Sequence, residues 1–223
     1  YEVRHSPDAS EPRIDVDIHG VKVVIPSSDT VRPSTLLKEN AAWVVNKQRD
    51  YEAYREQVPE RTFEEGELFP YLGDEYRLII ESCRKNEITE DAIRLRRSAV
   101  EQSSVKRVLE NFYRTLARDH FSRRLDHYAE QMGVDYDKLE LRNQRTLWGS
   151  CSTTGTISLN WRLIMAPHEV VDYLLVHELA HLIEQNHGKE FWNIVDEYDS
   201  NYKENAEWLA ENSTKLIFSK EDL

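Results

Sequence analysis

Apolar and polar residues alternate in several short stretches of the first hundred residues, which predicts β-strands. The stretches 14–18 and 21–25 place an apolar side chain at every second position, and His19-Gly20 between them suits a two-residue hairpin turn. Residues 69–80 predict a second hairpin, and residues 93–96 a further short strand. The first part of the chain is therefore expected to be rich in β-structure.

Spacings of three and four residues between apolar positions dominate the second part of the chain, which predicts helices. The longest such pattern begins after Ser104, whose hydroxyl suits a helix N-cap, and ends at Gly133, which suits the left-handed backbone of a helix C-terminus. A second strong pattern runs from Pro167, a residue favoured in the first turn of a helix, to about Gln185. Three further helices are expected over 33–54, 189–198 and 202–215.

Two short strands are expected between the two strongest helical patterns. One contains Leu139 and Leu141, and the other covers Thr156–Trp161. Together the patterns predict an α+β fold in two parts. A β-rich N-terminal region is expected over residues 1–100, followed by a helical domain with a small antiparallel sheet over residues 101–223.

Composition and charge restrict the class of protein. The chain has 223 residues, of which 39% are hydrophobic and 31% charged, and its formal net charge is −12. These values are typical of a globular domain, and they argue against attraction of the whole surface to nucleic acid or to anionic lipid. No apolar run approaches the ~20 residues of a membrane span, and the first residues lack the apolar core of a signal peptide.

Cysteine content and local charge add two expectations. Cys83 and Cys151 are the only two cysteines, too few for a disulfide framework, and this favours a reducing compartment. We therefore expect a cytoplasmic protein without a membrane partner. Residues 84–124 hold eleven Lys and Arg side chains against six acidic ones. Ion-paired helix faces explain that stretch more simply than a polyanion site, so a nucleic-acid partner is the less favoured interpretation.

The strongest chemical signal is the sequence His177-Glu178-Leu179-Ala180-His181 within the helix after Pro167. Histidines four residues apart project from one face of a helix, where two imidazoles can share one Zn²⁺ ion. Glu178 is not a ligand in this pattern and is placed to take a proton from zinc-bound water. Since most of the helix surface is apolar, we expect a buried helix whose histidines need a metal or a partner.

A catalytic zinc ion needs a third protein ligand and one open position. His187 is the preferred candidate, because Asn186 and Gly188 on either side tolerate the left-handed backbone that would turn its side chain back toward the helix. The alternative ligand is Glu184, which follows His177 by seven residues and lies on nearly the same helical stripe. If Glu184 is not a ligand, it could instead orient a ligand histidine.

Further motifs surround the histidine pair. They are Trp148-Gly149-Ser150-Cys151, Ile157-Ser158-Leu159-Asn160-Trp161-Arg162-Leu163, Ala166-Pro167, Tyr173, Leu182, Asn186-His187 and Phe191-Trp192. With the histidine pair, these residues resemble the YgjP-like metallopeptidase family of zincins, which is related to the SprT and WLM types. The resemblance covers most of the chain, and it includes residues 14–43 and 71–73 more loosely.

The resemblance has implications for the fold and for the site. It implies a gluzincin-like fold, zinc bound by His177, His181 and His187, and Glu178 as the general base. Zinc bound there would lower the pKa of its water and polarise a scissile carbonyl, and Glu178 would deliver the proton to the leaving amine. We therefore expect a zinc-dependent metallohydrolase, most simply a peptidase that acts on peptides or proteins.

Several finer points stay open at the level of sequence. The strand 156–161 could pair with an extended substrate if it forms a sheet edge, and Tyr198 or Tyr202 could stabilise the oxyanion. One alternative function is a nucleic-acid-associated protease, or an accessory protein of DNA repair or restriction, suggested by the basic stretch and by kinship with the SprT and WLM types. Another alternative is a non-catalytic module with structural zinc, which would need a fourth protein ligand.

Overall fold

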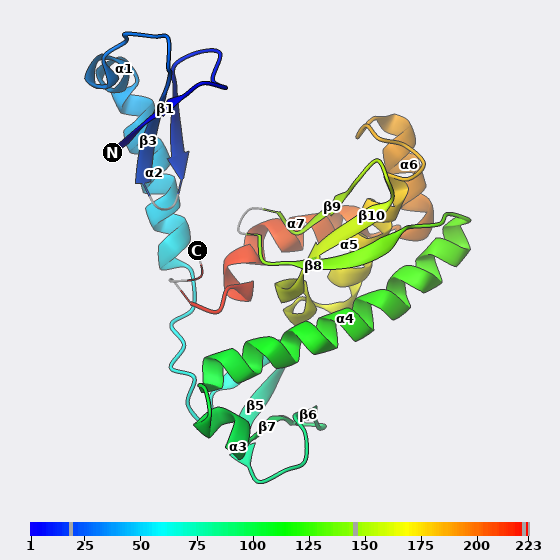
Figure 1. Ribbon diagram of the computed structural model, residues 1–223. Coiled ribbons are helices and arrows are strands. Elements are labelled where there is room, and N and C mark those ends of the chain that lie inside the picture. Colours follow the sequence, from blue (N-terminus) through cyan, green and yellow to red (C-terminus); the bar gives the residue numbers. More distant parts are fainter. Residues whose placement is uncertain (18–19, 145–146, 220–221, 223) are drawn as a thin grey trace. The chain divides into compact units, whose positions relative to one another are not determined.

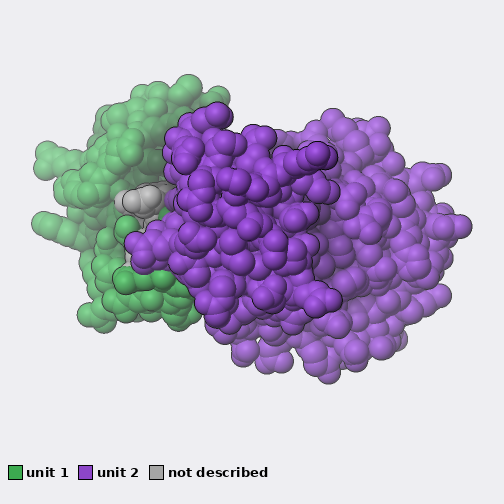
Figure 2. All heavy atoms as spheres, turned by 90° about the horizontal axis from the view of Figure 1, so that it is seen from below, with its two compact units in different colours: residues 1–60, 217–223 green, residues 61–216 purple. Residues whose placement is uncertain are grey.

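The computed structural model describes residues 1–17, 20–144, 147–219 and 222 (Figure 1). The chain forms two compact units, which Figure 2 distinguishes by colour. The first unit contains Tyr1–Glu60 and Ile217–Leu223, and the second contains Arg61–Leu216. Both α-helices and small β-sheets are present, so the predicted α+β class is confirmed.

The first unit contains a three-stranded sheet in the order β1-β3-β2, built from β1 (Glu2–Ser6), β2 (Arg13–Asp17) and β3 (Gly20–Pro26). The central strand β3 pairs antiparallel with β2 and parallel with β1. The predicted pairing of the first two apolar stretches is therefore confirmed, while residues 18 and 19 of the predicted turn lie outside the described residues. Strand β1 was not predicted, because its exposed sequence lacks apolar alternation.

Two helices replace the single helix expected over residues 33–54. These are α1 (Pro33–Glu39) and α2 (Ala41–Glu56). Asn40 separates them, and its side-chain amide donates to the Leu36 carbonyl at 2.9 Å. Asparagine forms such local bonds readily, and these bonds compete with continuation of a helix.

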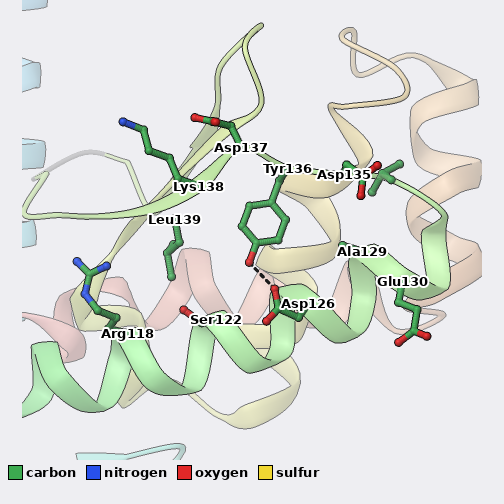
Figure 3. Close-up of a pocket in the computed structure, with 11 residues that line it drawn as sticks. Arg118, Ser122, Asp126, Ala129, Glu130, Asp135, Tyr136, Asp137, Lys138 and Leu139 are labelled. Carbon is green, nitrogen blue, oxygen red and sulfur yellow. Dashed lines mark hydrogen bonds between the residues drawn. The ribbon is translucent and has the colours of Figure 1, made fainter.

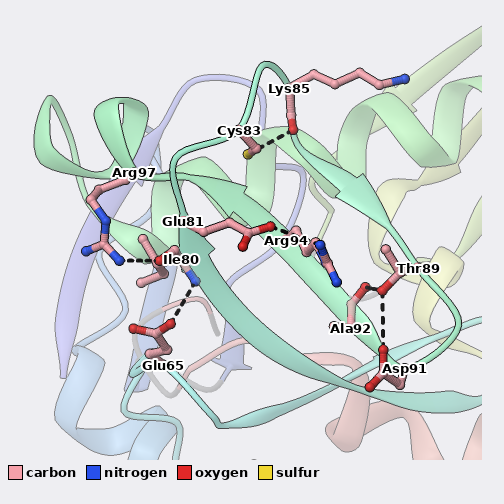
Figure 4. A network of polar contacts seen from close by, with 10 residues as sticks. All are labelled: Glu65, Ile80, Glu81, Cys83, Lys85, Thr89, Asp91, Ala92, Arg94 and Arg97. Atoms are coloured by element: carbon pink, nitrogen blue, oxygen red, sulfur yellow. Dashed lines mark hydrogen bonds and ion pairs between the residues drawn. The ribbon is translucent and has the colours of Figure 1, made fainter.

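The second unit begins with a four-stranded sheet in the order β4-β5-β7-β6. Its strands are β4 (Leu68–Tyr71), β5 (Asp74–Glu81), β6 (Glu87–Ile88) and β7 (Ala92–Arg96). The predicted hairpin over 69–80 and the predicted strand over 93–96 are both confirmed. Figure 4 shows polar contacts around this sheet, among them an ion pair of 3.1 Å that joins Glu81 of β5 to Arg94 of β7.

This sheet is joined to the helical region that follows it. The Tyr113 hydroxyl donates to the Pro70 carbonyl at 2.6 Å, and the Leu72 amide donates to the Ile164 carbonyl at 2.9 Å. Because of such contacts, the division between the compact units falls after Glu60, and the boundary expected near residue 100 lies inside the second unit. The change from strands to helices along the sequence does not coincide with the change in packing.

Helix α3 (Arg97–Glu101) leads into α4 (Val105–Met132), the longest helix of the structure's described part. The Ser104 hydroxyl accepts a hydrogen bond from the Arg107 amide at 3.2 Å, and Gly133 ends the helix with φ of 66°. Both predicted helix ends are therefore confirmed. The buried face of α4 carries Val108, Leu109, Tyr113, Ala117, His120, Phe121, Leu125, Ala129 and Met132.

A three-stranded sheet follows in the order β8-β10-β9, formed by β8 (Lys138–Arg142), β9 (Gly149–Cys151) and β10 (Thr156–Asn160). The sheet is mixed and not antiparallel as expected, because β10 pairs parallel with β8 and antiparallel with β9. Strand β10 lies in the centre, so the expectation that residues 156–161 form a sheet edge is wrong. Strand β9, which was not predicted, takes that place; three residues are too short to show a period.

Helix α5 (His168–Ala180) packs against the earlier elements α4 and β9 and against the later helices α6 and α7 (Figure 1). A 3₁₀ segment, η1 (Trp161–Met165), precedes α5. The elements that follow it are α6 (Lys189–Tyr198), α7 (Tyr202–Asn212) and η2 (Ser213–Leu216). None of the helices in the described ranges combines the length and the apolarity that a membrane crossing requires.

A buried histidine at the interface of α4 and α5 predicts a pH-dependent stability. The His120 side chain is 8% exposed, and its Nε2 has no hydrogen-bond partner among the described residues. The pKa of His120 is lowered to about 4, mainly by burial and to a smaller extent by His168, Arg123 and Arg124. Asp172 acts in the opposite direction and raises this pKa. Between about pH 4 and 6.5 the unfolded chain therefore binds a proton that the folded chain does not, and stability falls as the pH falls through that window.

We expect His120→Gln to reduce this loss of stability by on the order of 1 kcal/mol between pH 7.5 and pH 5. Urea unfolding of wild type and variant at both pH values measures the difference. The control His127→Gln alters an exposed histidine of the same helix and should keep the wild-type pH dependence. If His120→Gln also keeps it, the imidazole does not titrate as described.

Candidate metal centre

Helix α5 supplies the scaffold of the site. Its buried residues include Val171, Leu175, Val176 and Leu179, each 0% exposed, so the expected burial of this helix is confirmed. His177 lies in the last turn and His181 is the C-cap residue. The side chains of both histidines are thus held by a helix that is itself fixed by packing on several sides.

Three histidine side chains converge at the end of α5. The Nε2 atoms of His177 and His187 are 3.1 Å apart, and the ligand atoms of His177, His181 and His187 all lie within 4.8 Å of one another. Imidazole nitrogens bound tetrahedrally to one Zn²⁺ ion at about 2.0–2.1 Å would be separated by about 3.3 Å. The arrangement therefore fits a single small ion after minor adjustment of the side chains.

The chain reverses after α5 in a way that differs from the sequence expectation. The helix ends at Ala180 rather than near Gln185, and the Ile183 amide donates to the Ala180 carbonyl at 3.0 Å in a closing turn. Gly188 has φ of −79° and forms the extended N-cap of α6, so the left-handed backbone expected there is wrong. The early end of the helix is what allows His187 to return toward His177.

Glu184 stabilises this reversal. One of its carboxylate oxygens, Oε1, accepts a hydrogen bond from the Asn186 amide at 3.0 Å. Its backbone carbonyl lies 3.2 Å from Nδ1 of His181, which leaves Nε2 of that ring for another partner. Glu184 is not a member of the gathered ligand group, which among the described residues consists of the three histidines. The orienting role considered for Glu184 is thus carried by its backbone.

Aromatic side chains of α6 form the wall of the cluster. The Phe191 ring is fully buried, and its centroid lies 4.9, 4.6 and 4.7 Å from the rings of His177, His181 and His187. Nε1 of Trp192 donates to the His187 carbonyl at 3.1 Å, and Tyr202 stacks on the Trp192 ring with a centroid distance of 5.2 Å. In the sequence, Phe191 and Trp192 were part of a motif without an assigned role.

The bond from Trp192 to His187 leads to a prediction. We expect Trp192→Phe to raise the zinc dissociation constant by about 10–100-fold, because the segment carrying His187 loses its hydrogen-bond donor while an aromatic ring remains. Competition with a chromophoric chelator measures the constant. Trp208→Phe in α7 is the matched control and should leave it unchanged. Equal zinc affinity in wild type and Trp192→Phe would show that the bond does not hold the loop.

Glu178 directly follows His177 in α5 and is buried. Its side chain is 4% exposed, and among the described residues its Oε2 has no hydrogen-bond partner. Burial raises the pKa of Glu178 to about 8. In contrast, burial and the two neighbouring imidazoles lower the pKa of His177 to about 4. The histidine is therefore neutral at physiological pH, the form that binds metal ions, while the carboxyl group retains protons readily.

The tyrosines considered for oxyanion stabilisation have different surroundings. The Tyr198 hydroxyl donates to the Gln131 carbonyl in α4 at 3.4 Å, so it already has a hydrogen-bond partner in that helix. Tyr202 is near the cluster through its stack with Trp192. A third tyrosine, Tyr173 in α5, was not considered; its buried ring lies 5.9 Å from His177, centroid to centroid.

A separate groove of about 690 Å³ lies between α4 and β8 (Figure 3). Tyr136 crosses it and donates to Asp126 at 2.6 Å, and burial together with this bond raises the pKa of Tyr136 to about 12. Its lining includes Arg118 and Lys138 but none of the three histidines. The groove therefore does not belong to the metal centre.

Comparison with known proteins identifies the family. The family model described as "YgjP-like, metallopeptidase domain" matches residues 10–212. The chain therefore belongs to the YgjP-like metallopeptidase family. This confirms the resemblance found in the sequence. It also makes the protein a metallopeptidase that uses a metal cofactor and acts on peptide or protein substrates.

The other comparisons add no further assignment for this YgjP-like metallopeptidase. No curated protein matches the chain. The crystal structure of the metallopeptidase zymogen abylysin from Pyrococcus abyssi is similar at 23% identity and a TM-score of 0.39, over 44% of this chain and 99% of that one. The zymogen of Methanocaldococcus jannaschii jannalysin is similar at 20% identity and a TM-score of 0.38, over 42% and 96%.

Proposed function

We propose that the protein is a zinc-dependent peptidase whose metal ligands are His177, His181 and His187. The observation that carries this proposal is the convergence of three imidazoles at the end of α5, where the buried Glu178 directly follows His177 in the chain. Three nitrogen ligands suit Zn²⁺, and a site with three protein ligands leaves the fourth position for water and substrate. A structural zinc site is normally closed by four ligands, so the chemistry of the site favours catalysis over a non-catalytic module.

The proposed mechanism is amide hydrolysis with Glu178 as general base. When bound, the zinc ion would supply Lewis acidity, polarising the scissile carbonyl and acidifying the attacking water. Glu178 receives the proton of that water and delivers it to the leaving amine. Hydrogen bonding between His181 Nδ1 and the Glu184 carbonyl fixes the orientation of that imidazole.

Strand β9 is the proposed contact for an extended substrate. It ends the β8-β10-β9 sheet and packs against α5, so one of its edges has no strand partner among the described residues. A peptide that adds to this edge would have its backbone held next to the helix with the histidines. This interpretation moves the substrate edge expected at residues 156–161 to Gly149–Cys151.

The nucleic-acid alternative gains no support from the structure. Several basic residues of the 84–124 stretch have acidic partners: Arg94 pairs with Glu81, Arg114 with Glu110, Arg123 with Asp119 and Arg124 with Asp172. Paired side chains are less available for phosphate groups. These four pairs support the ion-paired interpretation of that stretch.

A digest of a peptide library tests the proposed function. Metal-depleted protein should be inactive, and one equivalent of Zn²⁺ should restore cleavage of peptide bonds. The same digest with added double-stranded DNA, at low and at high salt, should give the same rate. Cleavage that survives metal depletion would contradict the zinc proposal, and strong salt-sensitive stimulation by DNA would favour a nucleic-acid-associated protease.

A further inference from the structure

Strand β9 and the carboxyl group of Glu178 approach each other unusually closely at Gly149. A Cβ atom added to Gly149 would lie 2.9 Å from both Cγ and Cδ of Glu178 and would overlap Oε1. Distances under 3.0 Å essentially never occur for real Cβ atoms, so one of the two groups would have to move. The space that a side chain of residue 149 would fill is the space that the Glu178 carboxyl group occupies.

The backbone conformation does not explain a glycine at this position. Gly149 does not have the left-handed backbone that favours glycine. Other glycines do have it, namely Gly20, Gly66, Gly73, Gly133 and Gly155. An alanine could therefore adopt the backbone angles of residue 149. The three atoms nearest to an added Cβ atom all belong to the Glu178 side chain.

Neither the backbone of Gly149 nor the side chain of Glu178 can move easily. Gly149 is paired with Leu159 of the central strand β10, and the Asn160 amide donates to the Trp148 carbonyl at 2.8 Å. Glu178 is 4% exposed and belongs to a helix packed on several sides. A methyl group on Gly149 would thus displace the carboxyl group within a closed space, since close-packed interiors transmit such changes rather than absorb them.

We propose that Gly149 is a positioning residue, whose missing side chain forms the seat that holds the Glu178 carboxyl group beside the metal centre. This inference rests on the proposed role of Glu178 as general base. It assigns to the Trp148-Gly149-Ser150-Cys151 motif a second role besides offering a sheet edge to the substrate. Gly149 acts through Glu178 and forms no bond with the metal or the substrate.

The first test is Gly149→Ala in the zinc-loaded protein. We expect kcat for a model peptide to fall by about 100-fold, because a shift near 1 Å in a reacting group has effects of that size. KM should change much less, and zinc content should stay at one equivalent, since the three histidines lie on other elements. Wild-type kcat in this variant would overturn the proposal.

The second test separates positioning from general damage to the fold. Glu178→Asp shortens the side chain by one methylene group and should make room for the added methyl group. Gly149→Ala should therefore lower the melting temperature of the metal-free protein clearly when Glu178 is present, and much less in the Glu178→Asp background. Similarly, Glu178→Asp should reduce kcat by a smaller factor in the Gly149→Ala background than in wild type.

Gly188→Ala is the matched control for stability, because nothing lies within 4 Å of a Cβ atom added there. Its effect on the melting temperature should be small and independent of Glu178→Asp. If Gly149→Ala and Glu178→Asp are additive in melting temperature, the two groups are not coupled and the proposal is wrong. The melting temperatures do not depend on catalysis, so failure of Glu178 as general base would leave this coupling intact and would be seen separately.

Discussion

Replacing Glu178 with glutamine is expected to lower the rate of peptide hydrolysis by a factor on the order of 10²–10⁴. Glutamine has the same shape as glutamate, so it fits the space beside Gly149, but its amide cannot accept the proton of the attacking water. The metal ligands are unchanged, and zinc should remain bound at one equivalent. Cleavage of a fluorogenic peptide and metal analysis of the same sample measure the two quantities.

Stability provides the control for this variant. Burial raises the pKa of Glu178 to about 8, which means that the surroundings disfavour the ionised carboxylate. A neutral amide should therefore leave the metal-free protein at least as stable as wild type at neutral pH. Wild-type turnover in Glu178→Gln would remove this residue from the mechanism, while joint loss of zinc and stability would show that the variant does not isolate proton transfer.

Removing the third imidazole is expected to have a comparably large effect through the metal. In His187→Ala the zinc dissociation constant should rise by more than about 100-fold, since loss of a ligand exceeds the 10–100-fold effect of losing a supporting group. Peptide hydrolysis should be lost at stoichiometric zinc. Zinc at 100 times its dissociation constant stabilises a folded protein by about 2.7 kcal/mol, and this stabilisation of wild type should disappear in the variant.

Glu184→Gln is the informative partner of His187→Ala. The amide oxygen of glutamine can still accept the hydrogen bond from the Asn186 amide, and the Glu184 carbonyl next to His181 belongs to the backbone. The zinc dissociation constant should therefore rise by no more than the 10–100-fold expected when a supporting group is lost. The opposite pattern, with zinc retained in His187→Ala and lost in Glu184→Gln, would make Glu184 the third ligand.

The long helix and the histidine pair could be predicted from sequence because their signals are local. The Ser104 hydroxyl and the left-handed Gly133 mark the two ends of α4 through bonds made within a few residues. The four-residue spacing of His177 and His181 places both side chains on one face of any helix. Such features depend on the backbone period and hardly on the rest of the fold.

The edge strand β9 and the end of helix α5 depend on distant contacts. Strand β9 consists of three residues and becomes a strand because β10 offers it hydrogen bonds. Helix α5 ends at Ala180 although apolar residues continue to Ile183, because the Glu184 carboxylate and carbonyl stabilise a reversal instead. The role of Gly149 is equally invisible in the sequence, since it depends on the carboxyl group of a residue 29 positions later.

The boundary of the compact units shows the same limit on a larger scale. A change from strands to helices near residue 100 suggested a division there, yet Tyr113 of α4 donates to Pro70 of β4 and the two regions pack together. Sequence patterns describe what each segment forms, whereas the grouping of segments follows from side chains that meet across long separations.

Anomalous diffraction at the zinc absorption edge, from crystals of the wild-type protein grown with Zn²⁺, tests the central claim most directly. We predict one peak equidistant from a ring nitrogen of each of His177, His181 and His187, at about 2.0–2.1 Å, with the fourth position open to solvent. A peak at another site, imidazoles directed apart, or a fourth ligand supplied by the chain would contradict the assignment of a catalytic zinc centre.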